Sequence, residues 1–318
     1  MAAGDVTPLQ SATTVVVATR NRAVELQRTL RELRSLRPPP AVVVVDNAST
    51  DDTAGVVQAV NATGAGHRPV DWIRLERNCG VAARNVGVEQ AVTRYVAFCD
   101  DDSWYHPHAL RLAEQHLDDH PRLGLVAARV VVLPAGRTDP VCEEMARSPL
   151  GRERTLPGPS VLGFLACGAI VRRTAFLEAG GFNDVLHFPG EEEMLALDLA
   201  TLGWALCYVP EVVAYHQPSA GAMPGPARRR REERNRILTA LMRRPGSHCR
   251  RLLTALAGDT VRDPRKLTLW VSLARHAPAA LGRRAPVSDG LESRVELLEL
   301  LAARRATGVP PTSATRWW

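Results

Sequence analysis

Features that would mark a secreted or membrane-spanning protein are missing from this 318-residue sequence. No run of about 18 apolar residues occurs, and the start, M-A-A-G-D-V-T-P-L-Q, lacks a basic end followed by an apolar stretch. The six cysteines include no C-x-x-C pair, and several lie in apolar runs, where they behave as small hydrophobic residues. We therefore expect a cytoplasmic protein with reduced thiols, no transmembrane helix and no signal peptide.

The sequence also lacks both common glycine-rich phosphate loops. Neither G-x-G-x-x-G nor G-x-x-x-x-G-K-[ST] occurs, although these loops bind the phosphates of dinucleotides and nucleoside triphosphates in many enzymes. Dinucleotide-dependent enzymes and P-loop NTPases are therefore excluded. Apolar residues make up 45% of the chain and charged residues 23%, which is typical of a globular protein and excludes general disorder.

Lysine is nearly absent, and the arginines are unevenly distributed. Lys266 is the only lysine, and residues 228–318 hold 20 of the 40 basic residues but only 8 of the 34 acidic ones. This segment therefore has a net charge of +12 and the preceding residues −6, which suggests separate roles. Without interleaved aromatic residues or a recognisable binding fold, we expect no nucleic-acid partner. Two roles for the arginines remain open, a solvated helix with internal Glu–Arg pairs and contact with an anionic membrane surface.

Apolar runs alternate with amphipathic stretches over the first hundred residues, as in βα units that build a mostly parallel sheet. The expected strands are 13–19, 42–45, 70–75, 95–99, 123–133, 164–171, 205–209 and 212–215, and the expected helices are 24–36, 82–92, 107–117 and 193–202. Residues 134–160 show no period, so we expect either a mobile substrate loop or a disordered insertion. The composition of residues 218–227 indicates a linker, and helices are expected after it.

Three aspartates, Asp100 to Asp102, directly follow the strand expected at 95–99. In open α/β sheets, ligands bind at the carboxyl ends of the strands. The Asp-x-Asp spacing lets Asp100 and Asp102 reach one ligand, and carboxylate oxygens suit Mg²⁺ or Mn²⁺. The triplet alone leaves a second interpretation open, a solvated surface turn.

Two more charged residues are expected near this edge of the sheet. Asp46 ends the strand at 42–45, and a carboxylate there can accept the N–H groups of a nucleotide base. Arg84 lies near the start of a helix, where a guanidinium and the backbone N–H groups both favour phosphate. Together with a divalent cation, these residues predict a site for a nucleotide.

Four stretches in order resemble the inverting glycosyltransferases of family 2, which have the GT-A fold. They are V-V-V-A-T-R-N-R, V-V-V-V-D-N-A-S-T-D-D-T, N-C-G-V-A-A-R-N-V-G and Y-V-A-F-C-D-D-D-S-W. A later stretch, G-E-E-E-M-L-A-L-D-L-A-T-L-G-W, is similar to the second signature of the family, G-E-D-x-D-L before a helix that ends in G-W. The resemblance covers residues 13 to about 217, and the helical remainder is similar in style to actinobacterial members.

The resemblance implies roles for the matching residues. The implied nucleotide-binding residues are Thr19, Asp46, Arg84, Asp100 and Asp101, and the implied metal ligands are Asp102, Asp100 and His216. Thr19 and Asp46 would hold the base, Asp100 the ribose, and Arg84 would lie near the diphosphate. For His216, which follows the strand expected at 212–215, a surface or packing role is the alternative.

The catalytic base of the family is the Asp of its E-D pair, and Glu192 occupies that position here. Glutamate is longer by one methylene, so the resemblance leaves both Glu191 and Glu192 as candidates for the base. Trp104 follows the aspartates and either covers the sugar or the acceptor, or packs as a rim aromatic.

The resemblance implies a hexosyl- or deoxyhexosyltransferase that moves a sugar from a UDP-, dTDP- or GDP-linked donor to a hydroxyl of a glycan, lipid-linked or small-molecule acceptor. Such a reaction would belong to bacterial polysaccharide, glycolipid or glycosylated natural-product biosynthesis. A carboxylate takes the proton of the acceptor, and Mg²⁺ or Mn²⁺ stabilises the departing diphosphate. A sugar nucleotidyltransferase is a second hypothesis, although A-T-R-N-R lacks the glycine and lysine of a triphosphate loop. A catalytically inactive sugar-nucleotide binding protein is the third, because G-E-E-E lacks the aspartate of the signature.

The expected organisation is a GT-A catalytic domain over residues 1–220, followed by a linker and a basic helical region over 221–318. The nucleotide-binding half would span about 1–103 and the acceptor half about 104–220. The C-terminal helices either pack back on the catalytic domain or form a homodimer, and their charge is compatible with peripheral contact at the inner face of a membrane.

Overall fold

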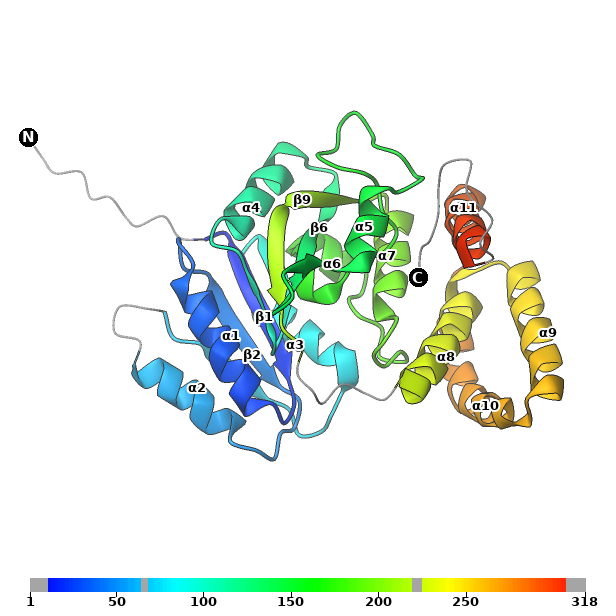
Figure 1. Cartoon of the computed structure of the whole chain (residues 1–318), viewed down its shortest axis with the longest axis horizontal. Coiled ribbons are helices and arrows are strands. Elements are labelled where there is room, and N and C mark those ends of the chain that lie inside the picture. Colours follow the sequence, from blue (N-terminus) through cyan, green and yellow to red (C-terminus); the bar gives the residue numbers. More distant parts are fainter. Residues whose placement is uncertain (1–10, 64–67, 219–224, 307–318) are drawn as a thin grey trace, which may run out of the picture.

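The computed structural model describes residues 11–63, 68–218 and 225–306, which form one mixed sheet flanked by helices (Figure 1). The strands are β1 (Thr13–Thr19), β2 (Ala41–Asp46), β3 (Asp71–Arg74), β4 (Tyr95–Asp100), β5 (Ser103–Tyr105), β6 (Leu123–Val132), β7 (Arg137–Thr138), β8 (Ala169–Arg172) and β9 (Ala205–His216). They are ordered β3-β2-β1-β4-β8-β6-β9-β5, with β7 paired to β6. This confirms the predicted α/β sheet.

The helices cover the sheet and continue beyond it as a C-terminal extension (Figure 1). They are α1 (Ala23–Ser35), α2 (Thr53–Ala62), α3 (Ala83–Gln90), α4 (Ala109–Asp119), α5 (Pro140–Ala146), α6 (Arg173–Glu178), α7 (Glu191–Thr201), α8 (Gly225–Arg243), α9 (Gly246–Arg262), α10 (Leu267–Gly282) and α11 (Asp289–Ala306). Short 3₁₀ turns occupy Gly80–Ala82, Ala166–Gly168 and Pro264–Lys266. The helix expected at 193–202 begins at Glu191, so both candidate base residues lie in its first turn.

The first four strands pair in parallel, as the alternating pattern predicts. The valines of β1 and β2 are at most 6% exposed, because helices cover both faces of this half of the sheet. Parallel pairing aligns the carboxyl ends of β1, β2 and β4: Thr19 pairs with Asp46, and Ala18 with Asp100. The strand ends that carry the candidate site residues are therefore neighbours.

Gly87 allows α3 to pack closely on this parallel half. A Cβ at this position would lie 2.4 Å from Val16 Cγ1 and 3.1 Å from Val45 Cγ2. Gly87→Ala is therefore expected to lower the free energy of unfolding by about 1–3 kcal/mol, measured by urea denaturation, because an added methyl displaces buried side chains. The control is Gly258→Ala in α9, where a Cβ meets nothing within 4 Å and a gain of about 0.5–1 kcal/mol is expected. Unchanged stability of Gly87→Ala would contradict the close packing.

The second half of the sheet has mixed pairing. β8 runs antiparallel to β4 and β6, while β9 runs parallel to β6. The sequence predicts two strands over 205–215, but β9 is one strand with a register shift at Pro210, which has no N–H to donate. The strand expected at 164–171 is shorter than predicted, because 166–168 form a 3₁₀ turn before β8.

Residues 134–160 contain regular structure that their composition does not reveal. They include β7 and α5, whose start is capped by the Asp139 carboxylate. Cys142 and Met145 of α5 are fully buried. The expectation of a disordered insertion is therefore wrong. A helix of seven residues is too short to show a clear apolar period.

The C-terminal helices pack back on the rest of the described chain. Val185, Leu186 and Met194 share one hydrophobic cluster with residues of α8, α9 and α10, including Ile237, Leu238, Met242, Leu256 and Leu269. Residues of α11 belong to the main core cluster, namely Leu291, Val295 and Leu298. Of the two predicted arrangements the structure therefore shows packing back, while a homodimer stays a prediction. Most of the expected linker, residues 219–224, lies outside the described residues.

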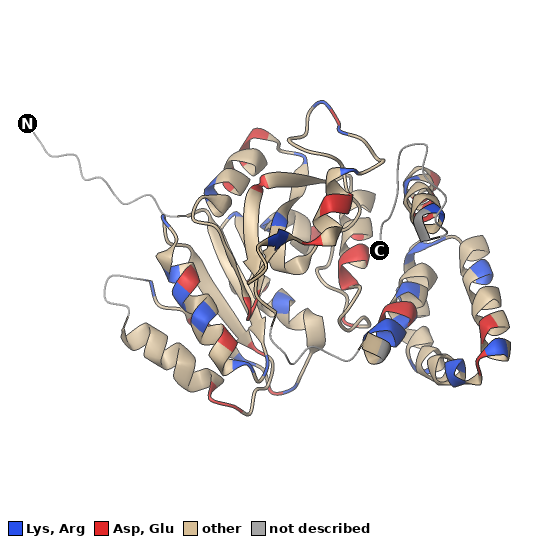
Figure 2. Ribbon diagram, in the orientation of Figure 1, with Lys and Arg blue, Asp and Glu red and all other residues tan. Residues whose placement is uncertain are grey.

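Charged residues lie along the C-terminal helices, with a concentration of arginines on α8 (Figure 2). One predicted internal pair is present, since Arg228 Nε lies 2.9 Å from Glu232 Oε1. Within the ranges that the structure describes, none of the helices has the length and apolar composition that crossing a membrane requires. Peripheral membrane contact stays a prediction.

Candidate functional site

The three aspartates form a tight connection between β4 and β5. Asp100 ends β4, and its N–H donates to Ser103 Oγ at 2.8 Å. Thr29 Oγ1 donates to the carbonyl of Asp101 at 2.8 Å. Asp101 and Asp102 are each only 7% exposed. The solvated surface turn is therefore wrong for these two carboxylates, which are buried and must be compensated.

Arg22, which follows β1, compensates both buried carboxylates. Its Nε lies 2.5 Å from Asp101 Oδ1, and its Nη2 lies 2.5 Å from Asp102 Oδ2. Thr19 Oγ1 donates to the other oxygen of Asp101 at 2.9 Å. Burial still raises the pKa of Asp101 to about 7, although Arg22 opposes the shift. The sequence analysis does not predict a role for Arg22. The position of this arginine could have indicated one, because it follows a strand that ends next to the three aspartates.

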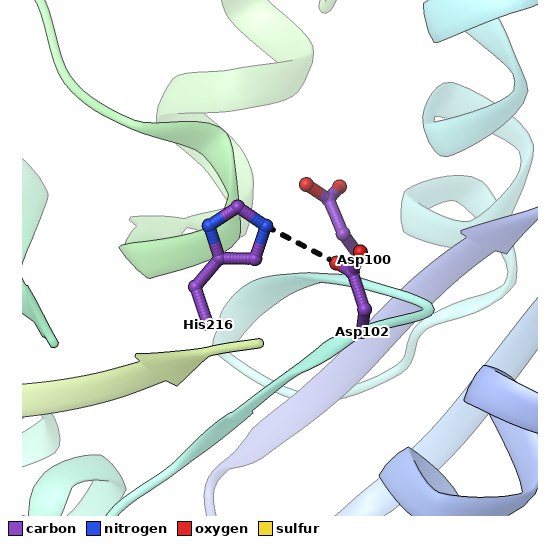
Figure 3. A group of neighbouring side chains, drawn as sticks. All are labelled: Asp100, Asp102 and His216. Atoms are coloured by element: carbon purple, nitrogen blue, oxygen red, sulfur yellow. Dashed lines mark ion pairs between the residues drawn. The ribbon is translucent and has the colours of Figure 1, made fainter. Parts of the chain in front are cut away.

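β5 brings His216 to the aspartates, as Figure 3 shows. Ser103 of β5 pairs with His216 of β9 in an antiparallel register. His216 Nε2 lies 3.3 Å from Asp102 Oδ1. Asp100, Asp102 and His216 each offer one ligand atom, and these atoms all lie within 4.8 Å of one another. The three predicted metal ligands are thus close enough to share one ion.

This group of donor atoms fits a divalent cation. The two carboxylates are hard ligands and the imidazole is an intermediate one. This combination suits Mn²⁺ and is also compatible with Mg²⁺. Arg22 holds Oδ2 of Asp102 and leaves Oδ1 directed toward His216. Burial lowers the pKa of His216, but the hydrogen bond with Asp102 and the negative charges of the neighbouring aspartates together outweigh this effect, so that the pKa is raised. A cation would therefore compete with a proton for the imidazole.

The first turn of α7 places two glutamates close to Arg84. Arg84 Nη2 lies 2.5 Å from Asp100 Oδ1, and its Nη1 lies 3.8 Å from Glu191 Oε1. Glu191 is fully buried, and neither of its carboxylate oxygens has a hydrogen-bond partner among the described residues. Burial, aided by the charge of Glu192 and opposed by Arg84, raises the pKa of Glu191 to about 8. Glu192 is only half-buried, and burial raises its pKa as well.

The Glu191 carboxyl is expected to make stability fall as the pH rises. Its folded pKa of about 8 lies above the ordinary value of 4.5, so between these values the folded protein holds a proton that the unfolded chain has lost. Because unfolding releases this proton, the equilibrium constant for unfolding rises by up to about tenfold for each unit of increase in pH. Arg84, Glu192 and Asp100 are the charged groups that face it. Glu191→Gln should remove this part of the slope.

Urea unfolding of the wild type and of Glu191→Gln between about pH 5 and pH 8 measures this slope. Glu89→Gln, at an exposed position on α3, is the matched control and should keep the wild-type pH profile. Parallel profiles for the wild type and Glu191→Gln would contradict the raised pKa.

Several of these groups line one cleft of about 660 Å³. The sheet edge and the first turn of α7 contribute Arg84, Asp100, His216, Glu191 and Glu192. The start of α5 contributes Asp139 and Val141, so part of the segment 134–160 reaches the cleft. Another wall comes from α8, through Arg228, Arg229, Glu232, Glu233 and Arg236. The sequence pattern assigns these α8 residues to a separate basic tail and does not predict their position.

Five predicted residues are not among those that line this cleft, namely Thr19, Asp46, Asp101, Asp102 and Trp104. Thr19 and Asp46 are 3% and 1% exposed, and Asp46 Oδ1 accepts the N–H of Ser49 at 2.7 Å. Their predicted contacts with the base stay predictions. Trp104 is 8% exposed, with its ring centroid 6.2 Å from that of Tyr215. For Trp104 the structure therefore shows the packing alternative.

The sequence matches a family model and several curated proteins over part of its length. The family model described as "Glycosyl transferase family 2" matches residues 14–180. A pre-mycofactocin glycosyltransferase of Mycobacterium tuberculosis is 33% identical over 208 residues, which is 64% of this chain and 42% of that protein. The uncharacterized glycosyltransferase YwdF of Bacillus subtilis is 32% identical over 104 residues, 32% of this chain and 37% of that protein. The chain thus spans less than half the length of these curated relatives.

Solved structures of glycosyltransferases share the fold. A mannosyltransferase from Pyrobaculum calidifontis, in complex with GDP-Man and Mn²⁺, has a TM-score of 0.59 at 21% identity, covering 96% of this chain and 86% of that chain. Residues 1–349 of TarS from S. aureus, in complex with UDP-GlcNAc, have a TM-score of 0.52 at 21% identity, covering 72% and 66%. These likenesses confirm the predicted GT-A fold.

Proposed function

The chain belongs to glycosyl transferase family 2, and we propose that it is an enzyme that transfers a sugar from a nucleoside-diphosphate donor to an acceptor hydroxyl, with inversion. The observation that carries the proposal is the cleft in which Arg84, Asp100, His216 and Glu192 meet. The cleft brings together a guanidinium group for the diphosphate (Arg84), two candidate metal ligands (Asp100 and His216) and a carboxylate that can act as the base (Glu192). Support comes from relatives named as glycosyltransferases and from structures of the same fold with GDP-Man or UDP-GlcNAc.

The residues divide the reaction between them. Arg84 and the amino-terminal end of α3 bind the diphosphate. Asp100, Asp102 and His216 would hold Mg²⁺ or Mn²⁺, which when bound adds positive charge next to the departing diphosphate. Because a diphosphate leaves without protonation, one carboxylate base suffices and no acid is needed.

Glu192, rather than Glu191, is the base in this proposal. Glu192 is half-buried and lines the cleft, so an acceptor hydroxyl can reach it. Glu191 is fully buried, so its carboxyl is less accessible to an acceptor than that of Glu192, and burial raises its pKa to about 8. A base must be both accessible and ionised to take the proton of the acceptor.

The nucleotide half of the proposed catalytic domain supplies the rest of the donor site. Thr19, Asp46 and Asp101 hold or position the base and ribose in the proposal, from the ends of β1, β2 and β4. The donor carries uridine, thymidine or guanosine, and the acceptor enters from the side of α7. In this proposal the catalytic domain spans residues 1–220. The C-terminal region also contributes to the site, because α8 lines the cleft.

The experiment that tests this function is release of nucleoside diphosphate from UDP-, dTDP- and GDP-linked sugars with Mn²⁺, with and without EDTA. Release from one class of donor, lost with EDTA, is the expected result. Release of pyrophosphate from a sugar phosphate and a nucleoside triphosphate would instead identify a nucleotidyltransferase. Binding of a donor without any release would identify an inactive sugar-nucleotide binding protein.

A further inference from the structure

The first half of α8, in the basic C-terminal region, lines the cleft with one of its faces. The residues that line the cleft fall on successive turns of the helix, three or four positions apart, and so lie on one side of it: Arg228 and Arg229, then Glu232 and Glu233, then Arg236. Arg228 also lies over the ring of Phe188, 5.3 Å from its centroid, on the segment that leads into α7. This face therefore forms part of the wall of the cleft, while its arginines remain exposed to solvent.

A buried asparagine fixes α8 against the start of α7. Asn235 is fully buried, and its Nδ2 donates to the carbonyl of Pro189 at 2.7 Å and also to the carbonyl of His187. Pro189 lies two residues before Glu191. The position of the α8 wall relative to the proposed base is thus set by hydrogen bonds between buried groups.

The charges of this wall are compensated unequally. Glu232 pairs with Arg228, and Glu233 Oε1 lies 2.9 Å from Lys266 Nζ, so both carboxylates have a cationic partner. Arg229 and Arg236 are exposed, and within the described part of the chain neither forms an ion pair within 4.0 Å or a side-chain hydrogen bond. They are seven positions apart, about 10 Å along the helix. The wall therefore presents to the cleft two guanidinium groups that form no close ion pair with the described residues.

The location of these guanidinium groups favours the acceptor over the donor. The diphosphate of the donor is expected beside Arg84 and Asp100, at the sheet edge. Arg236 instead acts electrostatically on Glu193, the residue next to Glu192, and on Glu299 of α11. The group that must approach Glu192 is the acceptor hydroxyl, so an anion bound by α8 would belong to the molecule that carries this hydroxyl.

We propose, on the basis of the proposed function, that Arg229 and Arg236 form an anion subsite for a phosphate group of the acceptor. Two guanidinium groups match a dianion, which favours phosphate over a single carboxylate. The phosphate would hold the acceptor while its hydroxyl faces Glu192. The same chemistry is offered by a soluble phosphorylated metabolite and by a lipid phosphate, so both are used as probes.

The test is a titration of the protein with glucose 6-phosphate, glucose and farnesyl phosphate, with and without saturating nucleoside diphosphate and Mg²⁺. The bound nucleoside diphosphate occupies the position next to Arg84, so that a probe phosphate is left with α8. Arg229→Gln combined with Arg236→Gln is expected to weaken binding of both phosphates by about 10- to 100-fold, since charge-assisted hydrogen bonds are lost. Glucose should bind no better to the wild type than to this double variant.

The matched control removes the same charge outside the cleft, by combining Arg230→Gln on α8 with Arg250→Gln on α9, both exposed. It should bind the phosphates within about twofold of the wild type, as expected for screened surface charges. An equal loss in the control, unchanged phosphate binding in the Arg229/Arg236 variant, or no phosphate binding by the wild type would overturn the subsite. A loss confined to farnesyl phosphate would support the subsite and identify a lipid phosphate as its ligand, whereas a loss confined to glucose 6-phosphate would identify a soluble phosphorylated acceptor.

Affinity for the nucleoside diphosphate is measured in the same experiment and separates the two proposals. It should be unchanged in the Arg229/Arg236 variant, and a parallel loss would assign these arginines to the donor instead. If no nucleoside diphosphate binds to the wild type, the proposed function fails, while the titrations without it still decide whether α8 binds phosphate. Arg229→Lys combined with Arg236→Lys should recover part of the phosphate affinity if charge is the cause.

Discussion

Asp102→Ala is expected to lower sugar transfer by about a thousandfold or more while leaving the protein folded. Asp102 links two parts of the proposed site, because Arg22 contacts one of its carboxylate oxygens and His216 contacts the other. Alanine removes a ligand from the proposed cation site and leaves the guanidinium of Arg22 with Asp101 and, at 4.0 Å, with Glu25. Stabilisation of a departing diphosphate is worth several kcal/mol, and about 1.4 kcal/mol corresponds to a factor of ten in rate.

Two measurements check this expectation. Turnover is followed as nucleoside diphosphate release at saturating donor, and Mn²⁺ affinity is followed by titration calorimetry without substrate. Asp119→Ala, which removes an exposed aspartate at the end of α4, should leave both unchanged. Thermal unfolding should show that both variants are folded. Full activity or unchanged Mn²⁺ affinity of Asp102→Ala would remove Asp102 from the proposed metal site.

The parallel half of the fold could be predicted from the sequence because its signals are local. The strand expected at 13–19 is confirmed at both ends as β1. Its β-branched run is buried on both faces, so pattern and environment agree. The alignment of Asp46 and Asp100 beside β1 then follows from parallel pairing. Neighbouring strand ends were therefore predictable without knowing any side-chain contact.

The contacts that complete the candidate site depend on pairing between distant segments. β5 is three residues long, too short for a periodic signal, yet its register with β9 sets His216 beside Asp102. Arg22 meets two aspartates about 80 positions later in the chain. α8 reaches the cleft because Asn235 binds the segment before α7. No local pattern encodes such partners, so composition alone assigned the arginines of α8 to a separate tail.

Glu192→Gln is expected to lower turnover by about a thousandfold and to leave donor affinity within a few-fold of the wild type. General base catalysis typically contributes about 10²–10⁴ in rate. Glutamine keeps the size and the polarity of the side chain but cannot take a proton, so binding of the donor is preserved. The measurement is kcat and KM for the donor with a working acceptor, together with donor affinity in its absence.

Glu191→Gln is the matched control, because it makes the same change one residue earlier. Glu191 is already protonated near neutral pH, with a pKa of about 8, and glutamine imitates the protonated carboxyl. Its turnover should therefore stay within about tenfold of the wild type near pH 7. The opposite result, a large loss in Glu191→Gln and a small one in Glu192→Gln, would make Glu191 the base. It would also require that binding of the substrates lowers the pKa of Glu191, since a base must be ionised before the acceptor hydroxyl can transfer its proton.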